Sequence, residues 1–527
     1  MKVVLIHVKE NFTPVPPMGI MYIGTLLKEK GHEVHIFDVA PANRKETLAR
    51  IKSIDPDIIG FSCMTTAYSV TSDFNKRLRE IVPHAYYCWG GVHPTARPEQ
   101  TMEENKLDFL VYGEGELTMV EVCERIKGRK KDPTKRGIDL SGIRGTYYFH
   151  SGKIHKNPPM PYIENLDTLP FPDRSMLENF EWYLSPPGIL RRKFHYGITT
   201  MYTSRGCPYG CIFCCSKIVL GKRIRQRSVA NVIAEMAYLK RNFGVTGIYF
   251  NDDTFATDEA WIKDFCETLK RSRLNMIWGC QTRANFAQNF GLMKMIVDAG
   301  CVQVDIGCES GSDRILNNLG KGITAKMILE SFRNLRRLNI DVFATFIIGN
   351  PGETMEDLKK TEYLASKAPG SVSFLILVPY PGSPLFDMAV KNKWFTGSAD
   401  YLVFDERWTN KQSDIPVMAA SFKASELVKI RAALDNKFFI KNYSMLVTDF
   451  IKNPYFFLKM AMTFIKNPLY MVRSAIKAAR KGKITDFLES VYQKFNEELR
   501  TRNRDMLTKK IQNLMRPAVG NAARRTK

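Results

Sequence analysis

The sequence has no run of about 18 consecutive apolar residues, the length at which a membrane-spanning helix becomes a candidate. We therefore expect no transmembrane segment. The first residues, Met1-Lys-Val-Val-Leu-Ile, lead directly into a strand-like stretch and lack a small-residue cleavage site, unlike a secretory signal peptide. The composition, 44% hydrophobic and 25% charged over 527 residues, is that of an ordinary globular protein with room for several domains.

Cysteine is absent after Cys308, and no second CxxC pair follows the single cysteine-rich loop. The first absence excludes a cysteine-rich C-terminal domain. The second disfavours a structural zinc site, which needs a fourth Cys or His at a similarly short spacing. The remaining cysteines are scattered among apolar runs of a long chain, which is unlike a disulfide scaffold. We expect a reduced, cytoplasmic protein.

Acidic residues are scarce toward the C-terminus. From Lys411 to Lys527 the chain has 24 Lys and Arg residues against 9 Asp and Glu, so 15 of its 23 net positive charges lie there. Such an asymmetry indicates an anionic partner, either a membrane surface or nucleic acid. Nucleic acid is not expected, because no recognition helix or RNA-binding motif accompanies the charge.

A short repeat lies inside this basic region. Phe450-Ile-Lys-Asn-Pro454 and Phe464-Ile-Lys-Asn-Pro468 recur 14 residues apart, and each proline interrupts a helix. We predict a basic helical region over 406–527. Its basic amphipathic helices favour peripheral contact of residues 440–482 with a membrane or a lipid-like substrate. An equally good interpretation is that these helices bury their apolar side against the rest of the protein.

Three cysteines are crowded into the stretch Cys207-Pro-Tyr-Gly-Cys211-Ile-Phe-Cys214, and Cys215 follows directly. Thiolates this close in a reduced protein are ligands or redox groups more often than packing residues. Three of them suit a [4Fe–4S] cluster with one iron left open, because such clusters are held by cysteine thiolates. Cys215 is interpreted as a packing residue rather than a thiol that faces the substrate.

This CxxxCxxC loop, with the aromatic Phe213 before its last cysteine, resembles that of the radical S-adenosylmethionine (SAM) superfamily. The resemblance implies that Cys207, Cys211 and Cys214 are the metal-binding, catalytic cysteines, with Phe213 beside the cofactor. The open iron would bind the amino and carboxylate groups of SAM. An external donor of the flavodoxin or ferredoxin type would supply the electron that cleaves SAM, and the resulting 5′-deoxyadenosyl radical would take a hydrogen atom from an unactivated carbon.

Residues 1–135 alternate strand-like and helical segments, which predicts a Rossmann-like parallel sheet with helices on both faces. Ligands bind such sheets beyond the carboxyl ends of the strands. Gly90-Gly91 and His93 follow the fourth predicted strand, and Gly113-Glu114 follow the fifth. Paired glycines let a backbone approach a bulky ligand, although tight turns alone would explain them equally well.

This segment resembles the cobalamin-binding domain that precedes the barrel in one branch of the superfamily. The resemblance implies that cobalamin is a cofactor contacted by the residues just named. The chain lacks the Asp-x-His-x-x-Gly motif that supplies a histidine to cobalt in mutase-type domains, so we expect no protein histidine beneath the cobalt. The alternative is a domain that binds a substrate or partner without cobalamin.

Residues 136–194 are predicted to form a linker with a small hairpin around Ser151-Gly152. From 195 to 405, six strand–helix units at regular spacing predict a partial (β/α)6 TIM-like barrel. The cluster loop follows its first strand, which is where α/β barrels place their chemistry.

Polar residues follow the next strands of the predicted barrel. The resemblance implies that Asp252 and Asp253 accept hydrogen bonds from the SAM ammonium, a three-donor cation. These carboxylates lack the further ligands that a metal site would need. Arg283 is a planar bidentate partner for the SAM carboxylate, with a surface salt bridge as the alternative.

Two further motifs, Gly307-Cys-Glu309-Ser310-Gly311-Ser312 and Gly349-Asn-Pro-Gly352, resemble the fourth- and fifth-strand motifs of this branch. The resemblance implies that Glu309 and Ser310 contact the amino acid or ribose of SAM. It also implies that the turn at Gly349 meets the adenine.

The overall layout resembles the class B radical SAM methyltransferases and the anaerobic cyclases that act on porphyrin esters. It implies a cobalamin-dependent enzyme that modifies an unactivated carbon of a small-molecule or lipid-like substrate, with methyl transfer from methylcobalamin as the usual outcome. Cyclisation or another oxidative outcome stays open. A non-catalytic iron–sulfur protein is a distant alternative, because its cluster would have four protein ligands.

Overall fold

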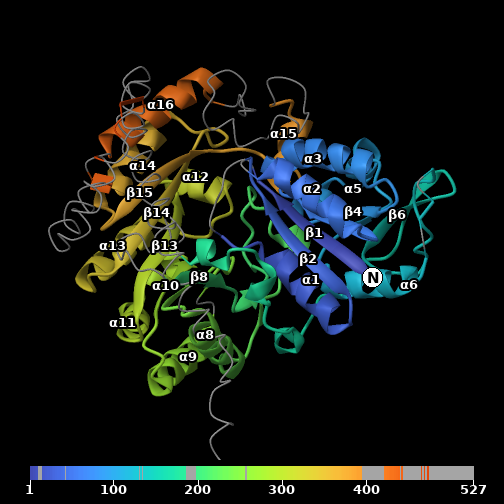
Figure 1. Ribbon diagram of the computed structural model, residues 1–527. Helices are drawn as coiled ribbons and strands as arrows, with labels where there is room; N and C mark the ends of the chain where they lie inside the picture. The colour runs from blue at the N-terminus through green and yellow to red at the C-terminus, as the bar shows by residue number, and fades with distance from the viewer. Residues whose placement is uncertain are drawn as a thin grey trace, which may run out of the picture.

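The computed structural model describes residues 1–9, 15–41, 43–129, 131–132, 134–184, 197–255, 258–394, 421–438 and 441–442, with four isolated positions between 465 and 473. It contains two large sheets that lie side by side, each with helices packed against it (Figure 1). The region 440–482, for which membrane contact is predicted, lies almost wholly outside the described residues. The predicted boundaries at 135, 194 and 405 stay predictions.

The first sheet has seven strands in the order β2-β1-β3-β4-β5-β6-β7. The first five are parallel, as alternation of strands and helices predicts, and β6 and β7 are antiparallel. The strands are β1 (Lys2–Val8), β2 (Glu33–Val39), β3 (Ile58–Ser62), β4 (Tyr86–Gly90), β5 (Phe109–Val111), β6 (Thr146–His150) and β7 (Lys153–Lys156). The hairpin predicted for the linker, β6–β7, thus extends the first sheet.

Helices cover both faces of this sheet. α1 and α6 share one buried cluster with Val3, Leu5 and Val111, whereas α2, α3 and α5 pack with Val4 and Ile6 on the other face. The alternation of β1 side chains between faces produces this division. The helices are α1 (Met18–Glu29), α2 (Arg44–Ile54), α3 (Tyr68–Ile81), α4 (Val92–Ala96), α5 (Pro98–Glu104) and α6 (Glu116–Ile126).

The second sheet has six parallel strands in the order β15-β14-β13-β12-β11-β8, so the expected α/β class and six-strand barrel sheet are confirmed. A two-stranded ladder, β9 (Ser204–Arg205) with β10 (Arg225–Gln226), flanks the cysteine loop. The sheet strands are β8 (Ile198–Met201), β11 (Gly247–Phe250), β12 (Ile277–Thr282), β13 (Cys301–Glu309), β14 (Asp341–Ile348) and β15 (Ser371–Ile376). The helices are α7 (Lys217–Leu220), α8 (Val229–Phe243), α9 (Glu259–Ser272), α10 (Ala284–Ala287), α11 (Phe290–Asp298), α12 (Asp313–Asn318), α13 (Ala325–Arg337), α14 (Met355–Lys367), α15 (Pro384–Lys391) and α16 (Ala424–Lys437).

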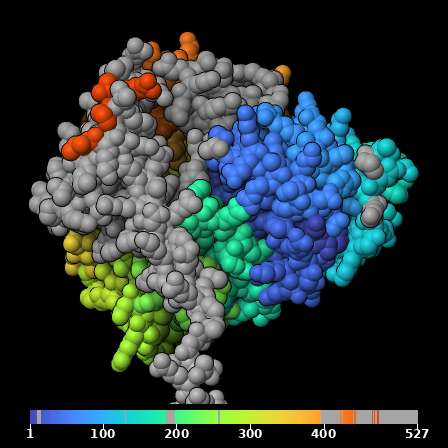
Figure 2. Space-filling model, in the orientation of Figure 1, coloured from blue at the N-terminus to red at the C-terminus, as the bar shows by residue number. Residues whose placement is uncertain are grey.

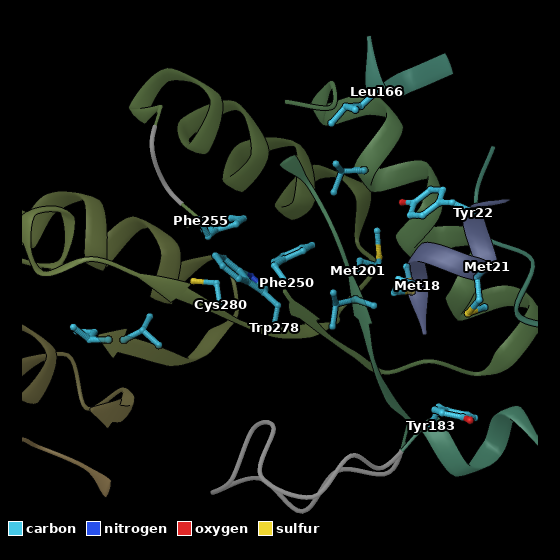
Figure 3. Packing of buried hydrophobic residues seen from close by; sticks show 14 of the residues in the cluster. Met18, Met21, Tyr22, Leu166, Tyr183, Met201, Phe250, Phe255, Trp278 and Cys280 are labelled. Carbon is cyan, nitrogen blue, oxygen red and sulfur yellow. The ribbon is translucent and has the colours of Figure 1, made fainter. Parts of the chain in front are cut away.

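The two sheets are joined by a shared apolar core. One buried cluster runs from α1 through the connector to β8 and β11, and Figure 3 shows Met18 and Tyr22 of α1 with Met201 of β8 in it. The fully buried Arg174 of the connector lies in this region, 2.8 Å from Met18 Sδ and donating to the Thr200 carbonyl at 3.1 Å. Figure 2 shows the first domain, in blue and cyan, on one side of the molecule and part of the barrel, in yellow-green, on the other.

The edge strand β15 is covered by α16. The ring of Phe438 packs against that of Phe374, with centroids 5.4 Å apart and the ring planes tilted by 45°. The Asn442 side chain accepts from Val372 N–H and donates to Val372 C=O, both at 2.9 Å, so it occupies the hydrogen-bonding positions of a neighbouring strand. These contacts protect an edge that would otherwise present unpaired backbone groups.

Among the described residues, no helix is both long and apolar enough to cross a membrane.

Candidate active site

A cavity of about 460 Å³ lies between the carboxyl edge of the first sheet and the carboxyl ends of β8, β11 and β12. Its inner wall includes Leu5, Gly60, Cys88 and Val111 of the first sheet. Its other side is formed by Tyr202, Asn251, Asp252, Asp253 and Gln281. The cavity therefore brings the carboxyl edges of both sheets to one space.

Several glycines form the wall nearest the first sheet. Gly90, Gly91 and Gly113 line the cavity, as the sequence predicts, and Gly19 of α1 lines it too. A Cβ at Gly19 or Gly113 would have no atom within 4 Å, so a side chain there would occupy the cavity. Gly91 has a φ of +102° and a Cβ there would lie 2.9 Å from the Cys63 carbonyl, which only glycine permits. Backbone walls of this kind fit a bulky flat ligand such as a corrin.

His93 is not at this cavity. Its side chain is fully buried, its ring lies 4.3 Å from that of Tyr68, and its Nδ1 is 3.3 Å from Thr65 Oγ1. Burial lowers the pKa of His93 to about 3, so the imidazole stays neutral. Among the described residues, those that line the cavity include no histidine.

Glu114 lines the cavity, but its carboxylate is bound by protein. It accepts from Arg205 at 2.9 Å, from Arg225 at 2.8 Å and from the Ile163 N–H at 2.9 Å. Burial alone would raise the pKa of Glu114, but the hydrogen bond from Arg225 and the charge of Arg205 hold it below the usual value. The sequence predicts that Glu114 lies at the carboxyl edge of the first sheet, but it does not predict the contacts with Arg205, Arg225 and Ile163.

The cysteine loop is held by backbone contacts just before its first cysteine and in its middle. Gly206 has a φ of +93°, and a Cβ there would lie 2.2 Å from the Arg223 carbonyl, so only glycine can precede Cys207. Within the loop, Ile212 N–H donates to the Leu319 carbonyl at 3.0 Å, and Leu385 N–H donates to the Ile212 carbonyl at 2.9 Å. The loop is thus held between the segments that follow β13 and β15.

The three loop cysteines are free thiols, with Cys211 buried and Cys207 and Cys214 partly exposed. Cys207 Sγ is 3.7 Å from Thr254 Oγ1, and Cys214 Sγ is 3.3 Å from Ser216 Oγ. No group of three His, Cys, Asp or Glu side chains among the described residues is arranged around a single metal ion. A cluster with one thiolate on each of three irons does not require such an arrangement, and the donor set fits it.

Phe213 faces the apolar side chains near the ends of β14 and β15. It packs with Ile347, Leu377 and Leu385 in a small apolar cluster near the ends of β14 and β15. Cys215 is also turned toward this side, with Sγ 3.6 Å from the Pro381 carbonyl, and burial raises its pKa to about 12. This placement agrees with the interpretation of Cys215 as a packing residue.

Asp252 is almost completely buried beneath the cavity. It accepts from Thr203 N–H at 2.7 Å, from the Thr203 hydroxyl and from Ser204 Oγ at 2.8 Å, so it ties β11 to the strand that leads into the cysteine loop. Burial raises the pKa of Asp252 to about 6. Asp253 is the exposed member of the pair. Nearby protein still shields its carboxyl group from part of the solvent, and this desolvation raises the pKa of Asp253.

Arg283 is directed at the cysteine loop. Its guanidinium lies 3.5 Å from the Tyr209 ring centroid, its Nη1 is 3.9 Å from Cys211 Sγ, and it donates to the Lys321 carbonyl. Glu309 pairs with Lys321 Nζ at 2.5 Å and has a φ of +62°, an uncommon backbone conformation for a residue other than glycine. The structure thus places Arg283 and Glu309 close to the cluster loop, linked through Lys321.

Ser310 and Gly349 lie in turns of the barrel where protein groups occupy their hydrogen-bonding atoms. Ser310 is fully buried, and its hydroxyl bonds with Thr361 Oγ1 at 3.2 Å and accepts from Ser312 N–H at 3.1 Å. Gly349 N–H donates to Glu353 at 2.6 Å, and a Cβ at Gly349 would lie 2.8 Å from Leu427 of α16. Both residues shape the turns after β13 and β14.

Some residues of the site have no strong sequence signal. Tyr202, Asn251 and Gln281 line the cavity, and Arg205 and Arg225 bind Glu114. Arg205 and Asn251 could have been selected because they adjoin the cysteine loop and the Asp252-Asp253 pair. Gln281 lies two residues before Arg283, whereas Arg225 has no such neighbour, and only the fold brings it to Glu114.

Comparison with protein families finds two matches. Residues 1–123 match the B12 binding domain, and residues 201–364 match the radical SAM superfamily. The chain is 32% identical over 457 residues to an uncharacterised methyltransferase of Pyrococcus horikoshii, covering 85% of this chain and 93% of that protein. The chain is a radical SAM enzyme with a B12-binding domain. Its cofactors are a [4Fe–4S] cluster, SAM and cobalamin, which confirms the predicted family and cofactors.

Two other relatives carry named activities. The cytidylyl-2-hydroxyethylphosphonate methyltransferase of Streptomyces wedmorensis is 25% identical and aligns over 80% of this radical SAM chain and 86% of its own. The anaerobic magnesium-protoporphyrin IX monomethyl ester cyclase of Cereibacter sphaeroides is 26% identical over 70% of this chain and 60% of its own. The cobalamin-dependent SAM radical enzyme OxsB shares the fold, with a TM-score of 0.67, 18% identity and coverage of 97% of this chain and 81% of that one.

Proposed function

We propose that this radical SAM enzyme transfers a methyl group, carried by cobalamin, to an unactivated carbon of a small-molecule or lipid-like substrate. The observation that supports methyl transfer most directly is the shared cavity, which borders the glycine wall of the B12-binding domain and the strand ends of the barrel. When bound, the cluster and SAM supply a hydrogen-abstracting 5′-deoxyadenosyl radical, and cobalamin supplies the methyl group. The protein positions these groups and excludes water.

The residues of the chain take distinct roles in this proposal. Cys207, Cys211 and Cys214 hold three irons, and the exposed Asp253 accepts from the SAM ammonium. Asp252 supports the strand that carries the loop, because three donors already occupy its carboxylate. Arg283 binds the SAM carboxylate from its position over Tyr209.

The turns behind the site have supporting roles. Ser310 and Gly349 would act on SAM through the backbone of their turns, because the Ser310 hydroxyl is bonded within the protein. Glu309 would orient the ribose while Lys321 compensates its charge. Gly90, Gly91 and Gly113 would admit the corrin to the cavity.

The inner face of the barrel sheet carries both apolar and polar side chains. Ile248 and Phe250 of β11 pack with the outer helices, so Tyr249 between them lies on the opposite face. Tyr249 donates to Asp305 Oδ2 at 2.6 Å, and Gln303 donates to Asp305 Oδ1 at 2.8 Å. Ile198 packs with Tyr249 on this face, and neither Tyr249 nor Asp305 lines the cavity, so a small-molecule and a lipid-like substrate are both candidates.

The test is product analysis under anaerobic conditions with a chemical reductant, SAM that carries a deuterated methyl group, and a pool of cell metabolites that includes lipids. Methyl transfer predicts a product with one trideuteromethyl group in place of hydrogen, together with S-adenosylhomocysteine and 5′-deoxyadenosine in equal amounts. One SAM donates the methyl group and the other is cleaved. A modified product with no deuterium, formed without S-adenosylhomocysteine, would refute methyl transfer.

Cyclisation is the second candidate, favoured by the similarity to the magnesium-protoporphyrin IX monomethyl ester cyclase. It would yield 5′-deoxyadenosine without S-adenosylhomocysteine, so the same assay separates the two outcomes. In either case an external reductant of the flavodoxin or ferredoxin type is expected to replace the chemical one.

The basic C-terminal region is proposed to make peripheral membrane contact, on the strength of its charge and its repeated Phe-Ile-Lys-Asn-Pro segments. Co-sedimentation of the full chain with anionic vesicles, compared with a chain that ends at residue 442, tests this role. Equal binding by the two chains would refute it.

A further inference from the structure

Two arginines face each other on the ladder that leads into the cysteine loop. Arg205 of β9 and Arg225 of β10 are direct partners in the antiparallel pair, and their side chains are 10% and 2% exposed. Like charges directly opposite each other destabilise such a pair. The ladder is therefore unfavourable unless an anion lies between the two guanidinium groups.

That anion comes from the other domain. Glu114 lies on the segment between β5 and α6. One of its carboxylate oxygens accepts from Arg205 at 2.9 Å, and the other accepts from Arg225 at 2.8 Å. Glu116 binds Arg205 at 2.5 Å, so the buried group contains two cations and two anions. Arg225 and the Glu114 carboxylate also bond with the backbone of Ile163, both at 2.9 Å, which adds the connector to the network.

The network joins two functional elements by a short path. On one side, Arg205 is separated from Cys207 only by Gly206, whose conformation is fixed by the Arg223 carbonyl. On the other, Glu114 lies between Gly113 and Gly115, which both line the cavity. A displacement of the B12-binding domain would therefore move the cluster loop or break buried ion pairs.

We propose that Glu114 is a positioning residue that fixes the cluster loop relative to the cobalamin-binding edge, instead of a residue that contacts cobalamin. Its carboxylate oxygens are occupied by Arg205, Arg225 and Ile163. Its removal would leave the buried charge of Arg225 uncompensated opposite Arg205, which would keep only Glu116 as its partner. Breaking a buried pair by removing one partner is strongly destabilising. The catalytic consequence rests on the proposed function, whereas the structural coupling does not.

Hydrogen exchange of the cofactor-free full chain tests the coupling. In Glu114→Gln we expect about 10- to 100-fold faster amide exchange in both segments of the network, 203–227 and 111–119, with little change in β13 and β14. The control is Glu103→Gln, because Glu103 belongs to the same domain and makes an exposed pair with Arg136. Exchange in Glu114→Gln identical to that of Glu103→Gln would overturn the proposal.

A double variant separates positioning from a general loss of stability. Glu114→Gln combined with Arg225→Gln removes one cation along with the anion and leaves the Arg205–Glu116 pair intact. We expect exchange in both segments to return toward the wild-type rates. If the double variant exchanges as fast as Glu114→Gln or faster, opposed charge is not the cause and the proposal fails.

A spectroscopic readout tests the consequence for the cofactors. In protein reconstituted with the cluster and cobalamin, pulsed electron paramagnetic resonance between the reduced cluster and cob(II)alamin should give a narrow distance distribution in the wild type and Glu103→Gln. The distribution should broaden in Glu114→Gln and narrow again in the double variant. A narrow, unchanged distribution in Glu114→Gln would overturn the positioning role. Normal distances and exchange with no methylated product in the wild type would instead refute the proposed function alone.

Discussion

Gly19 offers a test of the cavity that separates cofactor binding from folding. It is an exposed glycine at the second position of α1, its Cβ would meet no atom within 4 Å, and it lines the cavity. Replacement of such a glycine by a residue compatible with the helix reduces the entropy of the unfolded chain and stabilises a protein by about 0.4–1 kcal/mol. A leucine side chain at this position would also extend into the cavity of about 460 Å³.

We therefore expect Gly19→Leu to have opposite effects on two measurements. The free energy of unfolding of the cofactor-free protein should stay equal or rise by up to about 1 kcal/mol. Cobalamin retained after reconstitution and desalting, measured from the corrinoid absorption bands, should fall at least about tenfold, while iron and sulfide content stays at the wild-type level. The two cofactors are thus expected to respond independently.

Gly291→Leu is the matched control. Gly291 is also an exposed glycine at the second position of a helix, α11, and it does not line the cavity. This variant should retain both cofactors. Wild-type cobalamin content in Gly19→Leu would refute our assignment of the cavity, and equal losses in both variants would show that the effect is not specific to it.

Three further predictions concern the site and its support. Cys207→Ala should lose the cluster absorption and iron after anaerobic reconstitution, whereas Cys215→Ala should keep both; equal iron in the two variants would contradict the ligand assignment. Burial raises the pKa of Asp252 to about 6, so the folded protein holds this proton more tightly than the unfolded chain does. The resulting stabilisation is complete below the unfolded pKa and is lost as the pH rises through about 6, which lowers the free energy of unfolding by roughly 3 kcal/mol. Asp252→Asn should remove this pH-dependence, so urea unfolding between pH 4 and 8 should give a smaller decrease than in the wild type, and parallel curves would refute it. Asn442→Ala leaves two backbone groups of Val372 unpaired and should lower the free energy of unfolding by about 1–3 kcal/mol in urea, an expectation that an unchanged midpoint would contradict.

The position of α16 changes the interpretation of the C-terminal region. The sequence favours membrane contact and barrel capping equally, and α16 caps the barrel through Leu427 at Gly349 and Phe438 at Phe374. This contact accounts only for α16 among the described residues of that region. The repeated Phe-Ile-Lys-Asn-Pro segments follow it and lie outside the described residues, so membrane contact there stays a proposal.

The sequence determined the features that depend on local pattern. The spacing of Cys207, Cys211 and Cys214 predicts a cluster because thiolate ligation needs short spacing on one loop. The alternation of apolar strands and amphipathic helices predicts two parallel sheets, because parallel strands need helical crossovers. The glycines that follow these strands then had to lie at the carboxyl edges, where Gly90, Gly91 and Gly113 are found.

Only the tertiary structure decided which residues of the other domain lie against the carboxyl edge of each sheet. The partners of Glu114 lie 91 and 111 residues away, and neither arginine has a local motif that announces the pairing. His93 follows the Gly90-Gly91 pair by two residues, but it belongs to α4, which places its ring in the core against Tyr68. Periodicity sets which side chains share a face of one element, whereas the docking of two domains depends on the packing of all their surfaces. That docking created the shared cavity and the buried ion pairs that link it to the cluster loop.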